Sequence, residues 1–430
     1  MRTDTRMTAH HKVVLALLLG TQFMLTVDFS IFNVALPAIG KGVGLDSLQW
    51  VATAYALPAA GFTLLFGRIA DLAGRRRMFL IGLVLLAAAS LFGGLAIAPA
   101  MLLAARAAQG LATAISMPAA LALITTTFRE GPLRERALGL NGAITAAGFT
   151  TGALLGGVLT ELLGWRWAFL VNVPVAVIIL ALAPSLIPAD AGDRRTRLDL
   201  PGAITVTLGL LALVWGITTP GAARWVLLPA VTLLAAFWYA ELRSPHPLAP
   251  LHVLRRPTVG LGNLGGLTTA AMATGVTFLM TVHLQETLHL SPVVTGLAFG
   301  VPGALAMAGG AVAPRLIASL GAPAVLALGL AVQGLSTAAL LVTGDAWYVT
   351  AALAVCYFGN MIALVAAAVT ATSGLPNHEQ GLATGLSAMA QQIGITVGIP
   401  VLSALGDLHL GVGVAAAATV AVAVAVRVRG

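Results

Sequence analysis

The chain has 430 residues, of which 59% are hydrophobic and only 9% charged, and its mean hydropathy is +0.97. Soluble domains carry about 25% charged residues, so this composition excludes a water-soluble globular protein. The net charge of +8 does not indicate nucleic-acid binding, because the basic residues lie in short clusters between apolar runs. The single cysteine, Cys356, excludes an intrachain disulfide framework.

Long apolar runs follow one another along the whole chain. The first begins after Lys12 and is longer than the apolar part of a secretory signal, about 7–15 residues, so we expect it to be retained as a membrane span. The runs are also too long for barrel strands, and backbone groups in hydrocarbon must bond internally. The sequence therefore predicts an all-α polytopic membrane protein with fourteen spans. The predicted spans are 13–39, 48–67, 78–98, 100–127, 136–161, 167–187, 199–218, 225–242, 258–286, 292–313, 322–343, 346–372, 381–405 and 409–426.

The basic residues between the spans predict the orientation, because cytoplasmic segments of membrane proteins are enriched in Lys and Arg. With a cytoplasmic N-terminus, nineteen basic residues fall inside and three outside. Both termini are therefore predicted to be cytoplasmic. The inside residues are Arg2, Arg6, Lys12, Arg68, Arg75, Arg76, Arg77, Arg129, Arg134, Arg136, Arg194, Arg195, Arg197, Arg243, Arg255, Arg256, Arg315, Arg427 and Arg429, and the outside residues are Lys41, Arg166 and Arg224.

Three sequence patterns recur eight spans later and predict an internal repeat. Arg68 and Gly74 recur as Arg315 and Gly321, and the glycine pattern of the fifth span recurs in the thirteenth at a shift of 246. The segment ending at Asp28 resembles the segment ending at His283. We therefore expect two six-helix bundles at 1–190 and 257–430, with two inserted spans at 191–256.

Two charged residues lie within predicted spans of the first bundle. Asp28 lies in the middle of the first span, where a carboxylate costs about 2.5–3.5 kcal/mol on insertion scales. Burial disfavours its ionised form, so it is a candidate proton carrier, or alternatively a residue bonded only to neighbouring helices. Arg106 in the fourth span lies at a similar depth, about 5 Å apart at a rise of about 1.5 Å per residue. It is either the partner of Asp28 or a structural hydrogen-bond hub.

Two glycine-rich segments have a predicted mechanical role. In the fifth span, Gly148, Gly152 and Gly156 share one face, with Gly157 beside them, and small residues let helices approach closely. We expect this face to pack tightly and to lie at the contact between the two repeats. The short cytoplasmic loop from Gly67 to Arg77 is a candidate gating element. Its gating residues are Gly67, Arg68, Asp71, Gly74, Arg75 and Arg76.

Polar residues in the other spans are weaker candidates for a substrate cavity. His283 and Glu286 are three apart and share a helix face. We expect His283 to occupy the position of Asp28 in the second repeat, whereas Glu286 is equally consistent with a place at the outer membrane surface. The remaining cavity candidates are Asn33, Gln109, Gln391 and Gln392.

These residues together resemble the major facilitator superfamily, in particular its fourteen-span drug:proton antiporter family, over nearly the whole chain. The first-span segment Val27 to Pro37 is similar to the motif that holds the acidic residue of that family, and Gly67 to Arg77 is similar to its inner-gate motif. Arg106 to Gly110 resembles the fourth-span motif implicated in proton coupling. Other similar segments are Gly148 to Gly157, where Ala153 replaces the usual Pro, and Trp165 to Pro174.

The resemblance implies a proton-coupled antiporter that exports small amphipathic or cationic drug-like compounds by alternating access. One alternative is an exporter or importer of a single metabolite on the same fold. Another is a membrane protein without transport activity, although the sequence contains no metal-ligand cluster or paired carboxylates typical of an enzyme.

The expected partners follow from this interpretation. They are a small-molecule substrate, protons and the lipid bilayer, with no nucleic acid, and we expect the chain to work as a monomer in the cell membrane. We expect no cofactor and no metal, with the proton as coupling ion. A phosphate-binding loop needs Lys followed by Ser or Thr, and neither Lys12 nor Lys41 is, which argues against ATP as the energy source.

Overall fold

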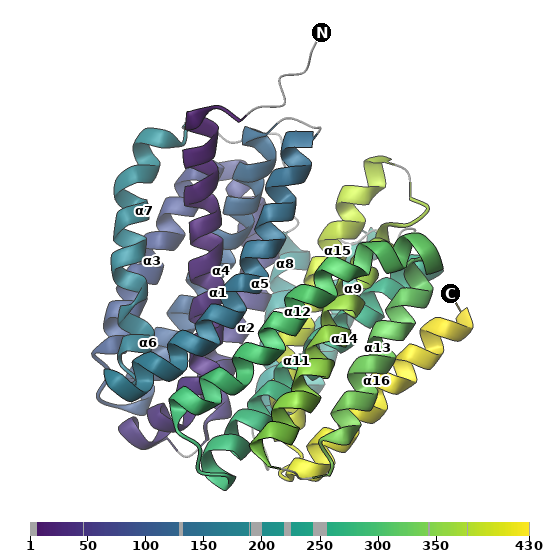
Figure 1. Cartoon of the computed structure of the whole chain (residues 1–430). Coiled ribbons are helices and arrows are strands. Elements are labelled where there is room, and N and C mark those ends of the chain that lie inside the picture. The colour runs from purple at the N-terminus through teal and green to yellow at the C-terminus, as the bar shows by residue number, and fades with distance from the viewer. Residues whose placement is uncertain are drawn as a thin grey trace. The chain divides into compact units, whose positions relative to one another are not determined.

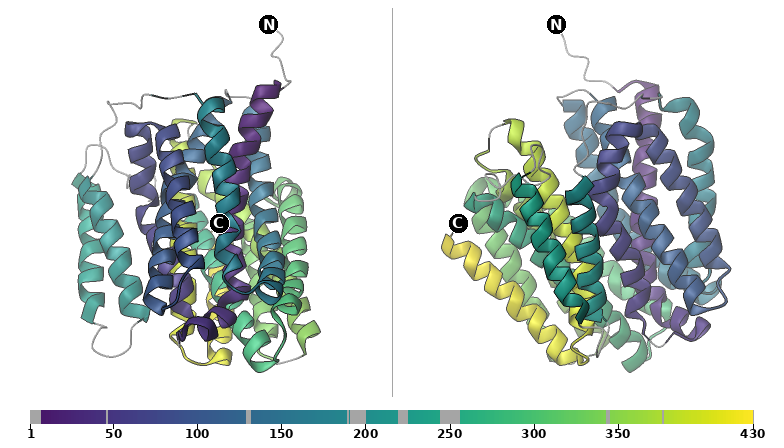
Figure 2. Two further views of the ribbon diagram at one scale, coloured as in Figure 1. Left: turned by 90° about the vertical axis from the view of Figure 1, so that its left-hand side faces the viewer. Right: turned by 180° about the vertical axis from the view of Figure 1, so that it is seen from behind.

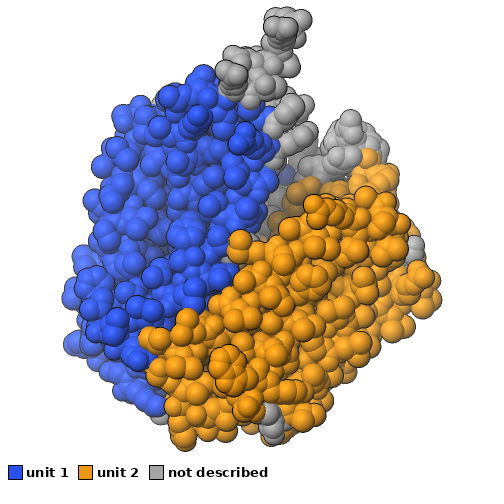
Figure 3. All heavy atoms as spheres, in the orientation of Figure 1, with its two compact units in different colours: residues 1–198 blue, residues 199–430 orange. Residues whose placement is uncertain are grey.

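The computed structural model describes residues 7–45, 47–128, 132–188, 190, 200–218, 225–243, 256–342, 345–375 and 377–429. Every regular element within these ranges is helical, and the helices are labelled in Figure 1. The chain divides into two compact units, residues 1–198 and 199–430, which are coloured separately in Figure 3. The helices α8 and α9 group with the second unit, and the predicted division at 190 and 256 stays a prediction.

Unit 1 contains seven labelled helices in the part of the chain that is described. They are α1 (Ala9–Val43), α2 (Gln49–Ala73), α3 (Arg75–Gly94), α4 (Pro99–Thr127), α5 (Pro132–Leu162), the short α6 (Trp167–Leu170) and α7 (Asn172–Leu186).

Unit 2 contains the remaining described helices. They are α8 (Leu200–Thr218), α9 (Leu227–Arg243), α11 (Pro257–Val282), the π-helical turn η2 (His283–Thr287), α12 (Pro292–Leu320), α13 (Ala322–Ala339), α14 (Ala346–Thr372), α15 (Asn377–Ser403) and α16 (Leu408–Arg429).

The described helices confirm a multi-span membrane fold, but not the count of fourteen. Eleven of them are long and apolar enough to cross a membrane, and a twelfth is counted if the two halves of α2, which bend by 52°, form one span. The two inserted spans appear as shorter apolar helices, Ile204–Ile217 and Leu227–Ala240. They lie side by side as the pair α8 and α9 (Figure 2). Eight of the basic residues used for the orientation lie outside the described residues: Arg2, Arg6, Arg129, Arg194, Arg195, Arg197, Arg224 and Arg255.

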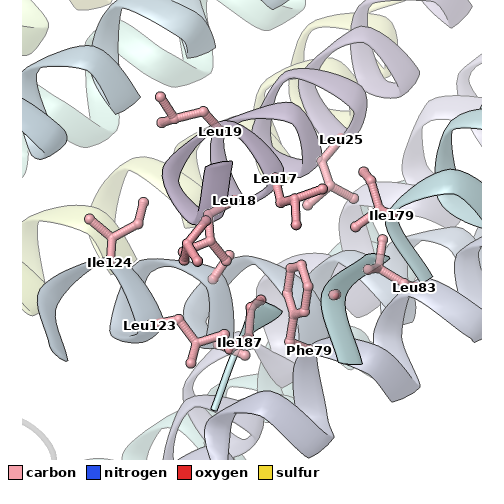
Figure 4. Packing of buried hydrophobic residues seen from close by; sticks show 14 of the residues in the cluster. Leu17, Leu18, Leu19, Leu25, Phe79, Leu83, Leu123, Ile124, Ile179 and Ile187 are labelled. Atoms are coloured by element: carbon pink, nitrogen blue, oxygen red, sulfur yellow. The ribbon is translucent and has the colours of Figure 1, made fainter. Parts of the chain in front are cut away.

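Helix α1 is the central element of unit 1. It packs against α5, α4 and α7, and it buries residues on all its sides, as expected for a helix that is apolar all round. Its leucines, such as Leu18, meet Phe79 of α3, Ile124 of α4 and Ile179 of α7 in one core (Figure 4). Any polar group on α1 at this depth is therefore enclosed by protein.

The predicted loop from Gly67 to Arg77 is helical almost throughout, and the loop prediction was wrong. Helix α2 continues to Ala73 and α3 begins at Arg75. Only Gly74 interrupts the helices, with φ at +97°, a conformation that glycine adopts without steric cost. A single left-handed residue thus turns the chain between two spans. Gly321, with φ at +82°, does the same between α12 and α13 in unit 2.

Candidate functional site

The carboxylate of Asp28 is the centre of a buried polar cluster in unit 1. Asp28 has no exposed surface. Its Oδ1 accepts hydrogen bonds from Gln109 Nε2 at 2.8 Å and from Asn172 Nδ2 at 2.5 Å. Its Oδ2 faces Arg106 NH1 at 3.4 Å, which completes a buried ion pair. Helices α1, α4 and α7 therefore meet at this carboxylate.

The guanidinium of Arg106 has several partners besides Asp28. Its Nε donates to the carbonyl oxygen of Val51 at 3.2 Å, and its NH1 donates to Gln109 Oε1 at 2.8 Å. Its Cζ lies 3.8 Å from the ring centre of Phe32 and 4.4 Å from that of Tyr55. Aromatic faces attract cations, so the positive charge is stabilised by neutral groups as well as by the carboxylate.

Ser90 of α3 joins the two amides of the cluster. Its Oγ accepts from Gln109 Nε2 at 2.9 Å and from Asn172 Nδ2 at 3.4 Å. Ser90 and Asn172 are functional residues that the sequence did not single out. The signal for Asn172 was present in the segment Trp165 to Pro174, whereas nothing in the sequence distinguishes Ser90 from other small polar residues. Gln109, predicted to line a cavity, lies instead inside this cluster.

The cluster can hold and release one proton. All three protein groups that contact the Asp28 carboxylate are donors, and donors favour the ionised form, whereas burial disfavours it. When Asp28 takes up a proton, Arg106 keeps Val51 and Gln109 as acceptors. Protonation therefore does not leave the buried cation without hydrogen bonds, an arrangement that would be costly.

The α2–α3 junction is fixed by carboxylates. Asp71 pairs with Arg75 at 3.0 Å. Asp190, beyond the end of α7, accepts hydrogen bonds from the backbone N–H groups of Arg75 and Arg76 at 2.7 and 3.0 Å. Carboxylates stabilise helix N-termini in this way, and α3 has no cap from its own preceding side chain. The sequence did not indicate Asp190, which lies 115 residues away.

The other predicted gating residues lie near this junction. Arg76 donates to the carbonyl oxygen of Pro184 at 2.7 Å, so it joins α3 to α7 within unit 1. Arg68 is half-buried. A methyl group on Gly67 would make an ordinary contact, 3.6 Å from Pro118. The junction thus brings Asp71, Arg75, Arg76 and Asp190 together, but not Arg68.

The glycine face of α5 lies against α1, and the prediction that it lies at the contact between the repeats was wrong. A methyl group on Gly152 would lie 2.7 Å from Ser30 and 2.8 Å from the carbonyl oxygen of Val27. Gly148 and Gly156 face the backbone of the same helix, and Gly157 is buried. The glycines are needed because α1 and α5 approach so closely that backbone meets backbone. They place the helix that carries Asp28.

The cavity candidates of unit 2 are not gathered in one place. His283 is buried at the start of η2, and its Nδ1 has no hydrogen-bond partner among the described residues. Glu286 is exposed on the same turn. Gln391 and Gln392 on α15 are half-buried, and Gln391 lies near Gly266 of α11. Asn33, in unit 1, is buried on α1.

His283 does not occupy the position that corresponds to Asp28, so that prediction was wrong. Gly152 packs on Val27 and Ser30, and its repeat partner Gly398 packs on Ala271 and Thr274. Positions 27 and 271 are 244 apart, as are 30 and 274, and the same shift takes Asp28 to Met272. His283 lies three turns farther along, because the sequence match compared only the ends of the two helices.

Comparisons with known proteins agree with this architecture. Residues 18–399 match the model of the Major Facilitator Superfamily. The chain is 39% identical to a cephamycin export protein of Amycolatopsis lactamdurans, over 93% of this chain and 86% of that protein. It is 37% identical to a puromycin resistance protein of Streptomyces alboniger, over 91% and 81% respectively. It is 36% identical to a lincomycin resistance protein of Streptomyces lincolnensis, over 93% and 85%.

Solved structures share the fold at low sequence identity. A POT family transporter crystallised with 5-aminolevulinic acid aligns with a TM-score of 0.74 at 13% identity, and the alignment covers 96% of this chain and 95% of the other. The human organic anion transporter MFSD10 aligns with a TM-score of 0.68 at 15% identity, over 98% and 99%. At these identities the likeness shows the fold alone.

Proposed function

The chain belongs to the major facilitator superfamily, and from this premise we propose that it exports small drug-like molecules from the cytoplasm in exchange for protons. Relatives that share most of its length are named for antibiotic export or resistance, which supports drug efflux. The single observation that supports proton coupling is the fully buried carboxylate of Asp28 beside Arg106. A buried acid in a membrane span is costly and typical of proton relays.

In the proposed cycle, Asp28 takes up a proton from the outside and releases it to the cytoplasm. The driving force is the inward proton gradient, in which the membrane potential contributes about 2.3 kcal/mol per 100 mV for each charge. Because Asp28 has no exposed surface, proton uptake requires a conformation in which α1 or its neighbours move. Substrate movement in the opposite direction is coupled to the same change in conformation.

The proposed function is tested in proteoliposomes with an imposed pH gradient, using radiolabelled puromycin and lincomycin as probes. We expect gradient-driven transport of at least one probe by the native protein and its loss in Asp28→Asn. Asp407→Asn is the matched control. Asp407 caps α16 by accepting from Leu410 N at 2.8 Å, and Asn is an equally good cap, so transport should persist. Full gradient-driven transport by Asp28→Asn would remove proton carriage by Asp28.

A second candidate is an exporter dedicated to one antibiotic class. It is favoured by the name of the cephamycin export protein, which is 39% identical to this chain. Competition distinguishes the two candidates. A multidrug exporter would transport both puromycin and lincomycin, each inhibiting the other, whereas a dedicated exporter would transport one compound and be insensitive to the rest.

A further inference from the structure

The side-chain amide of Asn172 makes the shortest hydrogen bond to the Asp28 carboxylate. Asn172 is the first residue of α7 and is 1% exposed. Both of its N–H bonds are directed into the cluster, one to Asp28 Oδ1 at 2.5 Å and one to Ser90 Oγ at 3.4 Å. An amide nitrogen can only donate. The contact therefore requires that Oδ1 of Asp28 carries no proton.

The amides thus determine which carboxylate oxygen receives the proton. Oδ1 accepts from both Asn172 and Gln109. Oδ2 faces only the longer 3.4 Å contact with Arg106 in the described part of the chain. A proton on Oδ2 displaces one weak contact, whereas a proton on Oδ1 would disrupt two strong ones.

We propose that Asn172 is a positioning residue for proton coupling, which keeps the Asp28 carboxylate ionised and so sets the pH range in which its proton is released. This inference rests on the proposed function. Gln109 could not be tested in the same way, because it also accepts from Arg106. In the described structure the amide of Asn172 contacts Asp28 and Ser90 but not Arg106, so its replacement changes the carboxylate and leaves the cation's own partners in place.

The other ionisable groups around Asp28 are few in the described residues. Arg106 on α4 is the charged neighbour, and Tyr55 on α2 is the second titratable one. From α5 the glycine face contacts α1, and from α3 and α7 the neutral Ser90 and Asn172 reach the cluster. Replacement of Asn172 therefore alters hydrogen bonding to Asp28 without altering the charges nearby.

The experiment measures protonation of Asp28 directly, by infrared difference spectra of the full chain in lipid membranes over a pH series. The carboxylic C=O band of Asp28 is identified by its loss in Asp28→Asn. In Asn172→Leu we expect its titration midpoint to move to higher pH by about one unit, which is tenfold in proton affinity. Asn172→Ser, whose hydroxyl is too short to reach Oδ1, should shift the midpoint in the same direction and is informative where the Leu variant does not fold.

Asn360→Leu is the matched control, since Asn360 is also a buried amide, which donates to Thr269 in the neutral cluster of unit 2. Its midpoint should equal that of the native protein. If the Asp28 band titrates but moves in neither Asn172 variant, the role of Asn172 is overturned while Asp28 remains a proton carrier. If the titrating bands are unchanged in Asp28→Asn, the proposed function fails and the role of Asn172 fails with it.

Discussion

The guanidinium group of Arg106 is bound by its shape as well as by its charge. It lies between the rings of Phe32 and Tyr55 and donates from two different nitrogens to separate acceptors. Only a planar group with several N–H bonds can make these contacts together. The Tyr55 ring is itself held by a hydrogen bond from its hydroxyl to Thr113 at 2.9 Å. The site of Arg106 is therefore built by neutral groups from three helices.

Arg106→Lys should abolish most of the proton-driven transport although it keeps the charge. A lysine cannot lie flat between both rings and still reach Val51 and Gln109. One hydrogen bond to a charged group contributes about 1.5–3 kcal/mol, so loss of one lowers the rate about tenfold or more. Initial transport rates in proteoliposomes measure this loss.

Arg166→Lys is the control for that experiment. Arg166 also stacks on an aromatic ring, that of Trp165 at 4.6 Å, and donates to the carbonyl oxygen of Ala96 at 3.3 Å. It is exposed and lies outside the cluster, so its replacement should change the rate less than about twofold, as expected for surface substitutions. Equal losses in the two variants would show that the geometry around Arg106 has no special role.

At the scale of elements, glycines on one helix have opposite structural roles. Gly152 on α5 faces the backbone of α1, whereas a methyl group on Gly142 of the same helix would meet nothing within 4 Å. The first glycine permits a close approach of helices. The second is a helix residue without a packing reason, and alanine is the better helix former by about 0.8–1 kcal/mol.

Gly152→Ala should therefore destabilise the protein and Gly142→Ala should stabilise it slightly. Overpacking costs about 1–3 kcal/mol, since the backbone of α1 must move to admit the methyl group. Thermal unfolding in detergent measures both changes. Because α1 carries Asp28, we also expect Gly152→Ala to lower transport, and changes of the same sign in both variants would contradict the packing described here.

The α2–α3 junction offers a second matched pair. Gly74 and Gly321 both have positive φ, but only Gly74 is approached by another segment, with the backbone oxygen of Asp190 2.7 Å from the position of a methyl group. Alanine at either position costs about 1–2 kcal/mol in backbone strain. Gly74→Ala should cost more, because it also displaces Asp190 from the N-terminus of α3. A comparison of the two unfolding temperatures measures that contact, and equal temperatures would show that Asp190 is not anchored there.

At the scale of the whole molecule, the two units repeat the same local geometry with different chemistry. Ser90 and Gln109 bond in unit 1, and the residues 247 positions later, Thr337 and Cys356, are in contact at 3.4 Å in unit 2. The same shift takes Arg106 to the buried, apolar Leu353. Unit 2 has instead a neutral cluster in which Asn360 and Gln333 bond to Thr269. We infer that proton chemistry has been concentrated in the first repeat.

The predicted orientation is testable because the single native cysteine is buried. Lys41→Cys, at the exposed end of α1, should react with a membrane-impermeant maleimide in intact cells. Arg429→Cys, at the exposed end of α16, should react only after the membrane is permeabilised. The native protein is the unlabelled control. Labelling of Arg429→Cys in intact cells would reverse the orientation derived from the basic residues.

The sequence by itself determined that the chain lies in a membrane, where its main spans fall and that Asp28 and Arg106 lie at similar depth. These follow from local properties, since apolar length and charge are fixed residue by residue. Only the tertiary structure decided which helices face each other. It joined Asn172 to Asp28 across 144 residues and Asp190 to the start of α3. It also placed the glycines of α5 on α1 and shifted His283 away from the position of Asp28. Helical periodicity tells which residues share a face, but the partner of that face depends on packing between distant segments, which no single span encodes.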